Sequence, residues 1–186
     1  MKPIFGVVHG RFQIFHLDHL KYVKAAAERC QHLVVGITNP DPERTKFDPA
    51  DPKRSSKEAN PLTYFERHLM VKTSLLEEGF RPDSFSVVPF PINFPELWEY
   101  YVPLEAVFYL TIYDDWGRKK FELFRQRGLK VEVLWEKPIE EKGITATRVR
   151  ELIKTGDEKW KTLVPRGTIK VLEELNLIIK LEERSC

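Results

Sequence analysis

The fold of this chain follows from one stretch, Val7-Val8-His9-Gly10-Arg11-Phe12-Gln13-Ile14-Phe15-His16-Leu17-Asp18-His19-Leu20. Apolar residues predict a buried strand over residues 4–9, and helical spacing begins at Leu17. Gly10 lies between the two, where the backbone turns tightly and a phosphate can approach without meeting a Cβ. The helix then offers its free N–H groups and its positive dipole end to an anion. The sequence therefore predicts an anion site at the end of the first strand.

Outward from this junction, apolar runs suited to buried strands alternate with segments of helical period. The expected strands are residues 4–9, 33–38, 85–90, 106–112 and 131–135. The expected helices are residues 17–29, 62–77, 118–127, 147–154 and 165–175. Strands separated by helices of this length predict right-handed crossovers. The pattern therefore indicates an α/β fold with a parallel sheet of about five strands, helices on both faces and a small C-terminal helical segment.

Length and composition are typical of a single soluble domain spanning residues 1–186, with 42% hydrophobic residues. Lys and Arg number 30 and Asp and Glu 28, and this near balance argues against a nucleic-acid partner. No apolar run approaches the roughly 20 residues that cross a bilayer, and no signal peptide precedes the first strand. Cys30 and Cys186 are far apart, which suits a reducing compartment. We expect a cytoplasmic protein without a membrane partner; homo-oligomerisation stays open, with apolar residues 175–181 as one candidate contact surface.

Two histidines carry the chemistry of the junction. His16 and His19 are three residues apart at the start of the expected helix, so both rings project from one face of its first turn. Beside a polyphosphate, two imidazoles can donate hydrogen bonds to oxygens as charge builds at phosphorus, and no nucleophilic side chain is needed. The spacing alone is more typical of a helix cap or a surface pair. The preceding strand, the glycine and Arg11 favour the phosphate interpretation.

A second candidate anion site is Lys142-Gly143-Ile144-Thr145-Ala146-Thr147-Arg148-Val149-Arg150. Thr145 or Thr147 can cap the helix that follows. Arg150 lies three residues beyond Thr147, so it can face the same ligand and neutralise phosphate charge. A capped surface helix with an arginine opposite Glu151 is the alternative, and the segment by itself favours that alternative.

One long segment interrupts the alternation of strands and helices. Residues 39–61 carry five prolines, many charges and almost no apolar residues. Because the segment follows the second strand, it leaves the carboxyl edge of the sheet, where ligands bind in open α/β folds. A functional loop and a solvated insertion are equally compatible with this pattern.

The motifs resemble those of nucleotidylyltransferases of the H-x-G-H class, especially the archaeal type of nicotinamide mononucleotide adenylyltransferase. The resemblance rests on Gly-Arg-Phe-Gln-x-Phe-His-x-x-His at 10–19, Asn-Pro-Leu-Thr-x-x-Glu-Arg at 60–67, Leu-Trp at 97–98 and Thr-x-Thr-x-x-Arg at 145–150. It implies a Rossmann-like, doubly wound fold. It also implies catalysis by His16, His19 and Arg150, and nucleotide binding by Gly10, Arg11, Phe12, Gln13, Thr145, Thr147 and Arg148.

The resemblance extends to the acceptor side of the site. Trp98 corresponds to the family's pyridine-nucleotide pocket, although an aromatic residue at such a position is more often part of a core. Arg67 is equally compatible with a surface charge and a charge that faces a ligand. After the fourth strand the family tends to have paired asparagines, whereas this chain has Asp114 and Asp115, and carboxylates favour cations, hydroxyls or amides. Asp115 is slightly more typical of a helix cap. We expect Arg67, Trp98 and Asp114 to contact the acceptor.

Asp18 stands between the two histidines, where the family usually has glycine. An acid in the first turn of a helix is favoured by the helix dipole, by roughly 0.3–1 kcal/mol. Alternatively, Asp18 helps to hold Mg²⁺ against the phosphates.

We therefore predict Mg²⁺-dependent transfer of an adenylyl group from ATP to a phosphorylated acceptor, nicotinamide mononucleotide by resemblance, giving NAD and pyrophosphate. Gly-Arg-Phe-Gln favours ATP, since cytidylyltransferases of the class tend to have Gly-Thr-Phe-Asp. One alternative is an ATP- or CTP-dependent transferase that acts on another phosphorylated metabolite, which Asp114, Asp115 and the 39–61 loop motivate. A second is a nucleotide-binding regulator without turnover, which Asp18 suggests.

Overall fold

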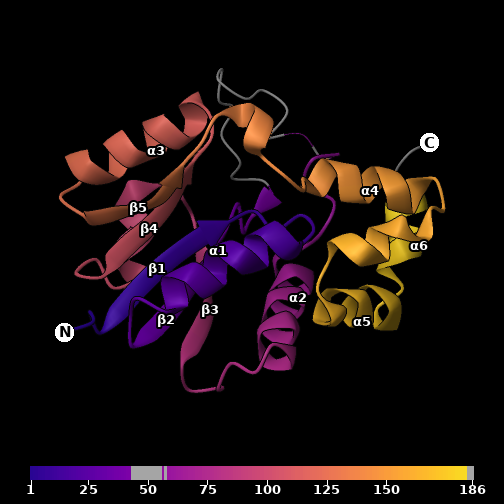
Figure 1. The fold of residues 1–186 in the computed structure, drawn as a ribbon, viewed down its shortest axis with the longest axis horizontal. Helices are drawn as coiled ribbons and strands as arrows, with labels where there is room; N and C mark the ends of the chain where they lie inside the picture. Colours follow the sequence, from indigo (N-terminus) through magenta and orange to yellow (C-terminus); the bar gives the residue numbers. More distant parts are fainter. Residues whose placement is uncertain (43–55, 57, 184–186) are drawn as a thin grey trace.

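The structure is a computed structural model and describes residues 1–42, 56 and 58–183. Five parallel strands form one sheet in the order β3-β2-β1-β4-β5 (Figure 1). Each strand lies within one residue of its expected bounds, so the predicted α/β fold is confirmed. In chain order the strands are β1 (Phe5–Gly10), β2 (His32–Thr38), β3 (Phe85–Phe90), β4 (Val107–Ile112) and β5 (Lys130–Glu136).

Helices cover both faces of the sheet, as the sequence predicts, because successive strand residues point to opposite faces. Val7 and Val8 of β1 accordingly belong to different hydrophobic clusters. Against the Val8 face pack α1 (Leu17–Ala27) and α2 (Tyr64–Glu77), and against the Val7 face pack α3 (Asp115–Gln126) and the 3₁₀ helix η3 (Pro95–Tyr100).

From the carboxyl ends of the neighbouring strands β1 and β4, the chain turns to opposite faces of the sheet. β1 leads into α1 on one face of the sheet, and β4 leads into α3 on the other. In folds of this kind a crevice opens between such strands, and ligands bind there. The anion site expected at the end of β1 therefore lies at this crevice.

Side chains just before the helices set where two of them begin. Thr63 and Glu66 form the expected capping box at α2: the Glu66 N–H donates to Thr63 Oγ1 at 3.2 Å, and the Thr63 N–H donates to Glu66 Oε2 at 2.7 Å. The third helix starts earlier than expected, and the assignment of its cap to Asp115 is wrong. The Gly117 N–H donates to the Asp114 carboxylate at 2.9 Å, so Asp114 is the cap.

The expected small C-terminal helical segment is confirmed by three helices that pack on one another, with the middle one against α2 (Figure 1). The apolar residues 175–181, expected as a surface for contacts between copies, lie mostly within the last helix. Leu177 and Leu181 are buried in the core, which corrects that expectation for both leucines, whereas Ile179 is exposed. None of the helices in the described part of the chain has the length and apolar character needed to cross a membrane. The helices are α4 (Ala146–Lys154), α5 (Arg166–Glu174) and α6 (Leu177–Glu183), with the 3₁₀ helix η5 (Glu158–Leu163) after α4.

Helix α5 braces the segment that precedes the two histidines. The Thr168 hydroxyl donates to the Phe15 carbonyl at 3.0 Å and lies 3.1 Å from Ser74 Oγ of α2. Gly167 lets the two helices approach, because a Cβ there would lie 2.4 Å from the Ser74 nitrogen. The C-terminal helices thus fix the backbone immediately before His16.

Gly167→Ala is expected to destabilise the protein, because the added methyl group would meet Ser74 backbone atoms that cannot rotate away. Overpacking of this kind costs about 1–3 kcal/mol. Lys170→Ala, on the exposed side of the same helix, is the matched control and should change stability by less than about 0.5 kcal/mol. Urea unfolding measures both free energies. A Gly167→Ala protein as stable as the wild type would contradict the close contact between α2 and α5.

Candidate active site

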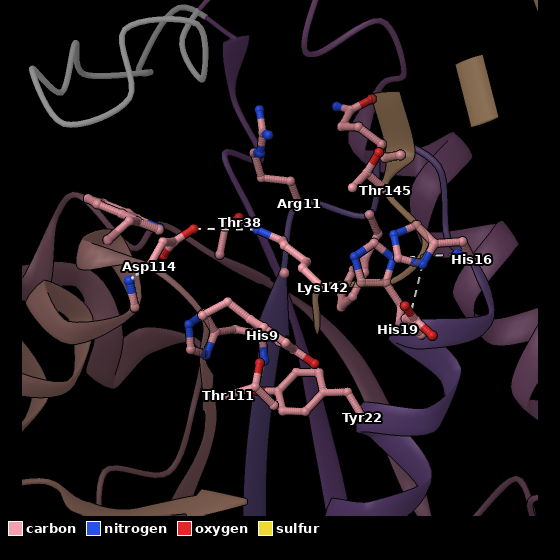
Figure 2. A pocket seen from close by; sticks show the side chains of 18 of the residues that line it. His9, Arg11, His16, His19, Tyr22, Thr38, Thr111, Asp114, Lys142 and Thr145 are labelled. Atoms are coloured by element: carbon pink, nitrogen blue, oxygen red, sulfur yellow. Dashed lines mark hydrogen bonds and ion pairs between the residues drawn. The ribbon is translucent and has the colours of Figure 1, made fainter. Parts of the chain in front are cut away.

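A pocket of about 400 Å³ opens at the carboxyl edge of the sheet (Figure 2). A volume of this size is typical of small-molecule sites. The lining residues come from the turn before α1, the ends of β2, β4 and β5, the start of α3 and the segment before α4. The lining includes Gly10, Arg11, Phe12, Gln13, His16, Asp18, His19, Tyr113, Asp114, Trp116, Trp135, Lys142, Ile144, Thr145 and Thr147.

The turn between β1 and α1 is shaped by Phe12. Its φ of 51° lies in the left-handed region, which costs a non-glycine residue on the order of 1 kcal/mol or more. The buried ring lies 2.6 Å from where a Cβ of Gly10 would be and contacts His19 edge-on, at a centroid separation of 5.0 Å. Gly10 is therefore required by the Phe12 ring, which fills the space beside it. The expected approach of a phosphate to Gly10, which lines the pocket, stays a prediction. The Phe12 ring thus packs against His19 and restricts the position of its ring.

Gln13 and Arg67 hold the chain segments around the pocket together. The Gln13 side chain donates to the Leu62 carbonyl at 3.0 Å and accepts from the Leu62 N–H at 2.9 Å. Arg67 is 2% exposed and is absent from the pocket lining. This position corrects the expectation that Arg67 contacts an acceptor, because its guanidinium instead donates to the carbonyls of Arg11, Thr38, Asn39 and Thr63.

The same contacts fix both ends of the 39–61 loop. Arg67 binds the carbonyl of Asn39, where the loop begins, and Gln13 binds Leu62, just past its end. Asn39 also lines the pocket. The question whether the loop is functional or a solvated insertion falls mainly on residues 43–55 and 57, which lie outside the described residues.

His16 and His19 cap each other's backbone at the start of α1. The His19 N–H donates to Nδ1 of His16, and the His16 N–H donates to Nδ1 of His19, both at 3.4 Å. The rings stack with centroids 3.6 Å apart. Because each Nδ1 accepts a backbone N–H, the proton of each neutral ring is on Nε2. The helix-cap alternative is confirmed, and both residues line the pocket. The His19 ring also has a hydrogen bond to the Ile14 backbone.

The surroundings of both rings favour their neutral forms. Burial, with a smaller contribution from the Lys142 ammonium, lowers the pKa of His16 to about 3. Burial, His16 and Arg11 hold the pKa of His19 well below its ordinary value. Both rings are therefore neutral near pH 7, and the positive charge of the pocket comes from other groups.

The second motif lies against the first, but its arginines do not reach the pocket. Thr145 caps α4 by accepting the Arg148 N–H at 3.2 Å, which settles which of the two hydroxyls is the cap. Thr145 and Thr147 line the pocket, as the resemblance implies. Arg150 is absent from the lining and donates to the Gln13 carbonyl and to Thr147 Oγ1, so it joins the motifs. Arg148 is exposed beside Glu151 and is likewise absent from the lining.

Lys142 is a pocket residue that the sequence analysis did not single out. Its ammonium lies 3.4 Å from the Asp114 carboxylate and 5.9 Å from the centre of the Tyr113 ring. Figure 2 shows the Lys142 side chain between Asp114 and the two histidines. Asp114, expected on the acceptor side, lines the pocket. The ion pair thus brings together the cap of α3 and the segment before α4.

The pocket also contains aromatic side chains that the sequence analysis did not assign to a site. Tyr113, Trp116 and Trp135 line it, and the Trp135 indole N–H donates to the Tyr113 hydroxyl at 2.7 Å. Their shared signal is position, since each lies at or just after the end of an expected strand. Trp98, by contrast, is 1% exposed and donates its indole N–H to the Pro91 carbonyl at 3.1 Å. The core alternative for Trp98 is therefore correct, and the expected acceptor contact is not.

The Asp18 carboxylate is held by a backbone N–H. One of its carboxylate oxygens accepts the Ile144 N–H at 2.7 Å. Across the described residues, 1–42, 56 and 58–183, no group of three His, Cys, Asp or Glu side chains is arranged to hold a metal ion. Asp18 could therefore supply at most part of the ligand set of a Mg²⁺ ion, with phosphate oxygens and water as the other ligands, and this role stays a prediction.

Acid is expected to destabilise the fold through His16. Between its ordinary pKa of 6.5 and the native value of about 3, the unfolded chain binds a proton that the native chain does not. The stability from this residue is therefore complete above about pH 6.5 and is lost as the pH falls toward 3. His16→Asn keeps a capping oxygen but does not titrate, so its unfolding free energy should fall less steeply below pH 6.5. Urea unfolding at several pH values measures both slopes, and parallel curves would contradict a neutral, buried His16.

Comparisons with known proteins indicate the family of this chain. Residues 7–152 match the family described as Cytidylyltransferase-like. The chain is 45% identical over 172 residues to the phosphonoformate cytidylyltransferase of Streptomyces viridochromogenes, and the alignment covers 92% of each protein. It is 31% identical over 184 residues to the nicotinamide-nucleotide adenylyltransferase of Ignicoccus hospitalis, with 95% of each protein covered.

A solved structure supports the fold. A bifunctional NMN adenylyltransferase/ADP ribose pyrophosphatase from Francisella tularensis superposes with a TM-score of 0.58 at 16% identity. The alignment covers 96% of this chain and 55% of that one, so this chain spans about half the length of that protein. The fold is thus Rossmann-like, as expected. With a family match over most of its length and two relatives aligned nearly end to end, this chain belongs to the cytidylyltransferase-like family of nucleotidylyltransferases.

Proposed function

We propose that this protein transfers a cytidylyl group from CTP to a small phosphonate or phosphate acceptor related to phosphonoformate. The observation that carries the proposal is the 45% identity, over 92% of both chains, to a phosphonoformate cytidylyltransferase. In the reaction an acceptor oxygen forms a bond to the α-phosphorus of CTP. The bond from that phosphorus to the bridging oxygen breaks, and pyrophosphate leaves with the electron pair.

The side of the pocket formed by α1 and α4 suits the triphosphate. Both helices begin at the pocket, and helix N-termini favour anions. His16 and His19 would donate from Nε2 to oxygens on which charge develops, while Arg11 and Lys142 would supply positive charge. Catalysis by this set would consist of positioning and charge stabilisation, without a covalent enzyme intermediate.

The acceptor side supports a small acceptor better than nicotinamide mononucleotide. Of the three acceptor contacts expected from the sequence, Trp98 and Arg67 lie outside the pocket lining and only Asp114 lies on it. The Asp114 carboxylate already occupies the N-terminus of α3 by accepting the Gly117 N–H. A phosphate of the acceptor would therefore bind away from that helix end, and Lys142, which is paired with Asp114, is a cation beside it.

A second candidate function is adenylyl transfer from ATP to nicotinamide mononucleotide. The specific observation in its favour is the opening Gly10-Arg11-Phe12-Gln13, which resembles the archaeal adenylyltransferases, together with a 31% identical relative of that activity aligned over 95% of both chains. In either reaction we propose that Mg²⁺ enters with the triphosphate, because phosphate oxygens and water supply most ligands of such ions.

Pyrophosphate release with CTP or ATP, each combined with phosphonoformate or nicotinamide mononucleotide, tests the proposal. We expect the highest kcat/KM for CTP with phosphonoformate. The highest value for ATP with nicotinamide mononucleotide would establish the second candidate instead. Tight nucleotide binding without turnover of any pair would overturn both and would support a nucleotide-binding regulator.

Lys142→Met is expected to lower kcat/KM by about 10²–10³-fold, the usual effect of removing one group that stabilises developing charge. The variant keeps the length and apolar stem of the side chain and removes only the ammonium. Lys154→Met is the matched control, since Lys154 is exposed on α4 and is absent from the pocket lining. Steady-state kinetics with CTP provide the measurement, and equal activity of the two variants would remove Lys142 from the triphosphate site.

A further inference from the structure

Asp18 links two phosphate-facing motifs that are far apart in sequence. It lies in the first turn of α1, between His16 and His19, and is partly buried. The Ile144 N–H donates to its Oδ2 at 2.7 Å across 126 positions of sequence. The hydrogen bond involves a charged acceptor, which makes it stronger than a bond between neutral groups.

Gly143, just before Ile144, is shaped to receive this carboxylate. A Cβ on Gly143 would lie 2.5 Å from Asp18 Oδ2, and the three nearest atoms all belong to Asp18. The φ of Gly143 is outside the left-handed region, so its backbone does not itself require glycine. The missing side chain therefore matters because Asp18 is there.

The segment held in this way carries functional groups on both sides of the contact. Lys142 precedes Gly143, and its side chain lies between Asp114 and the histidines with its ammonium paired to Asp114 (Figure 2). Thr145 follows Ile144 and caps α4 at the pocket. A loss of the Asp18 contact would release Lys142 and Thr145 together, without removing either group.

We propose that Asp18 is a positioning residue that, through the Ile144 amide, holds residues 142–145 and with them the Lys142 ammonium at the triphosphate side of the pocket. The proposal rests on the proposed function only for the identity of the bound nucleotide. It explains why a carboxylate is accommodated next to a site for phosphates, since the charge of Asp18 faces the 142–145 backbone. A positioning role also predicts that Asp18→Asn keeps most of the activity, whereas a metal ligand would lose its charge and its function in that variant.

A double-mutant cycle tests the contact. Asp18→Ala removes the acceptor, Gly143→Ala displaces it, and each should lower kcat/KM by about ten- to a hundredfold, as misplaced groups do. In the double variant the new methyl group no longer meets a carboxylate, so the double variant should be no worse than Asp18→Ala alone. Multiplied losses in the double variant would overturn the proposal.

Asp18→Asn separates positioning from charge and from metal binding. Asparagine keeps a side-chain oxygen for the Ile144 N–H, so this variant should retain most of the activity and the ordinary Mg²⁺ dependence. For Asp18→Ala, KM for the triphosphate should rise and kcat should fall at temperatures where circular dichroism shows the protein fully folded. A loss in Asp18→Asn as large as in Asp18→Ala, or a loss that added Mg²⁺ reverses, would overturn the proposal.

Amide hydrogen exchange tests the same contact without any substrate. The Ile144 amide should exchange faster in Asp18→Ala than in the wild type and at the wild-type rate in Asp18→Asn, with amides of β1 as internal controls. Unchanged exchange in Asp18→Ala would overturn the proposal whatever the kinetics show. If no acceptor is turned over but exchange responds as expected, the contact stands and only the proposed function fails.

Discussion

The reciprocal cap between His16 and His19 is the interaction on which the site depends. Each ring accepts the other residue's backbone N–H through Nδ1, so a single pair of hydrogen bonds starts α1, orients both rings and leaves the proton of each on Nε2. The arrangement needs support from two directions. The Phe12 ring packs under His19, and the Phe15 carbonyl, just before His16, is held by Thr168 of the C-terminal helices. Helix α5, which does not line the pocket, thereby helps to hold the backbone that carries the two histidines.

Because the two rings are buried and neutral, different residues supply the oriented hydrogen-bond donors and the positive charge of the pocket. Because their pKa values are lowered, the histidines remain neutral, and their rings are held in a fixed orientation without adding charge. Positive charge then comes from the cationic side chains that line the pocket, Arg11, Lys120 and Lys142. Before a ligand arrives, Lys142 is paired with Asp114. A triphosphate or an acidic acceptor must compete for that ammonium, and this competition favours a ligand with more negative charge than a single carboxylate offers.

The sequence predicted the sheet, the helices on its two faces and the position of the pocket, because these follow from hydrophobic period and from where strands end. It did not predict where individual side chains point. The sequence was equally compatible with Arg67 as a surface charge and as a charge that faces a ligand. The four carbonyls that accept hydrogen bonds from Arg67 come from segments that meet only in the folded chain. The contact of Arg150 with the Gln13 carbonyl likewise joins segments that are far apart in sequence, and no sequence pattern indicated it. The cap of α3 fell to Asp114 and not to Asp115 because the choice depends on backbone angles, which residue type does not fix.

The two sides of the pocket have different origins, and this difference bears on the choice of acceptor. The side proposed for the triphosphate is built largely from a continuous motif, residues 10–19, joined to residues 142–147. The acceptor side is built from residues that follow β4 and β5, including Tyr113, Asp114 and Trp135, whose only common feature is their place at the sheet edge. A substitution on the acceptor side can change the acceptor without disturbing the histidine cap. Relatives named for different nucleotides and acceptors can therefore align along nearly the whole chain, and the proposed acceptor contacts lie where the motif resemblance is weakest.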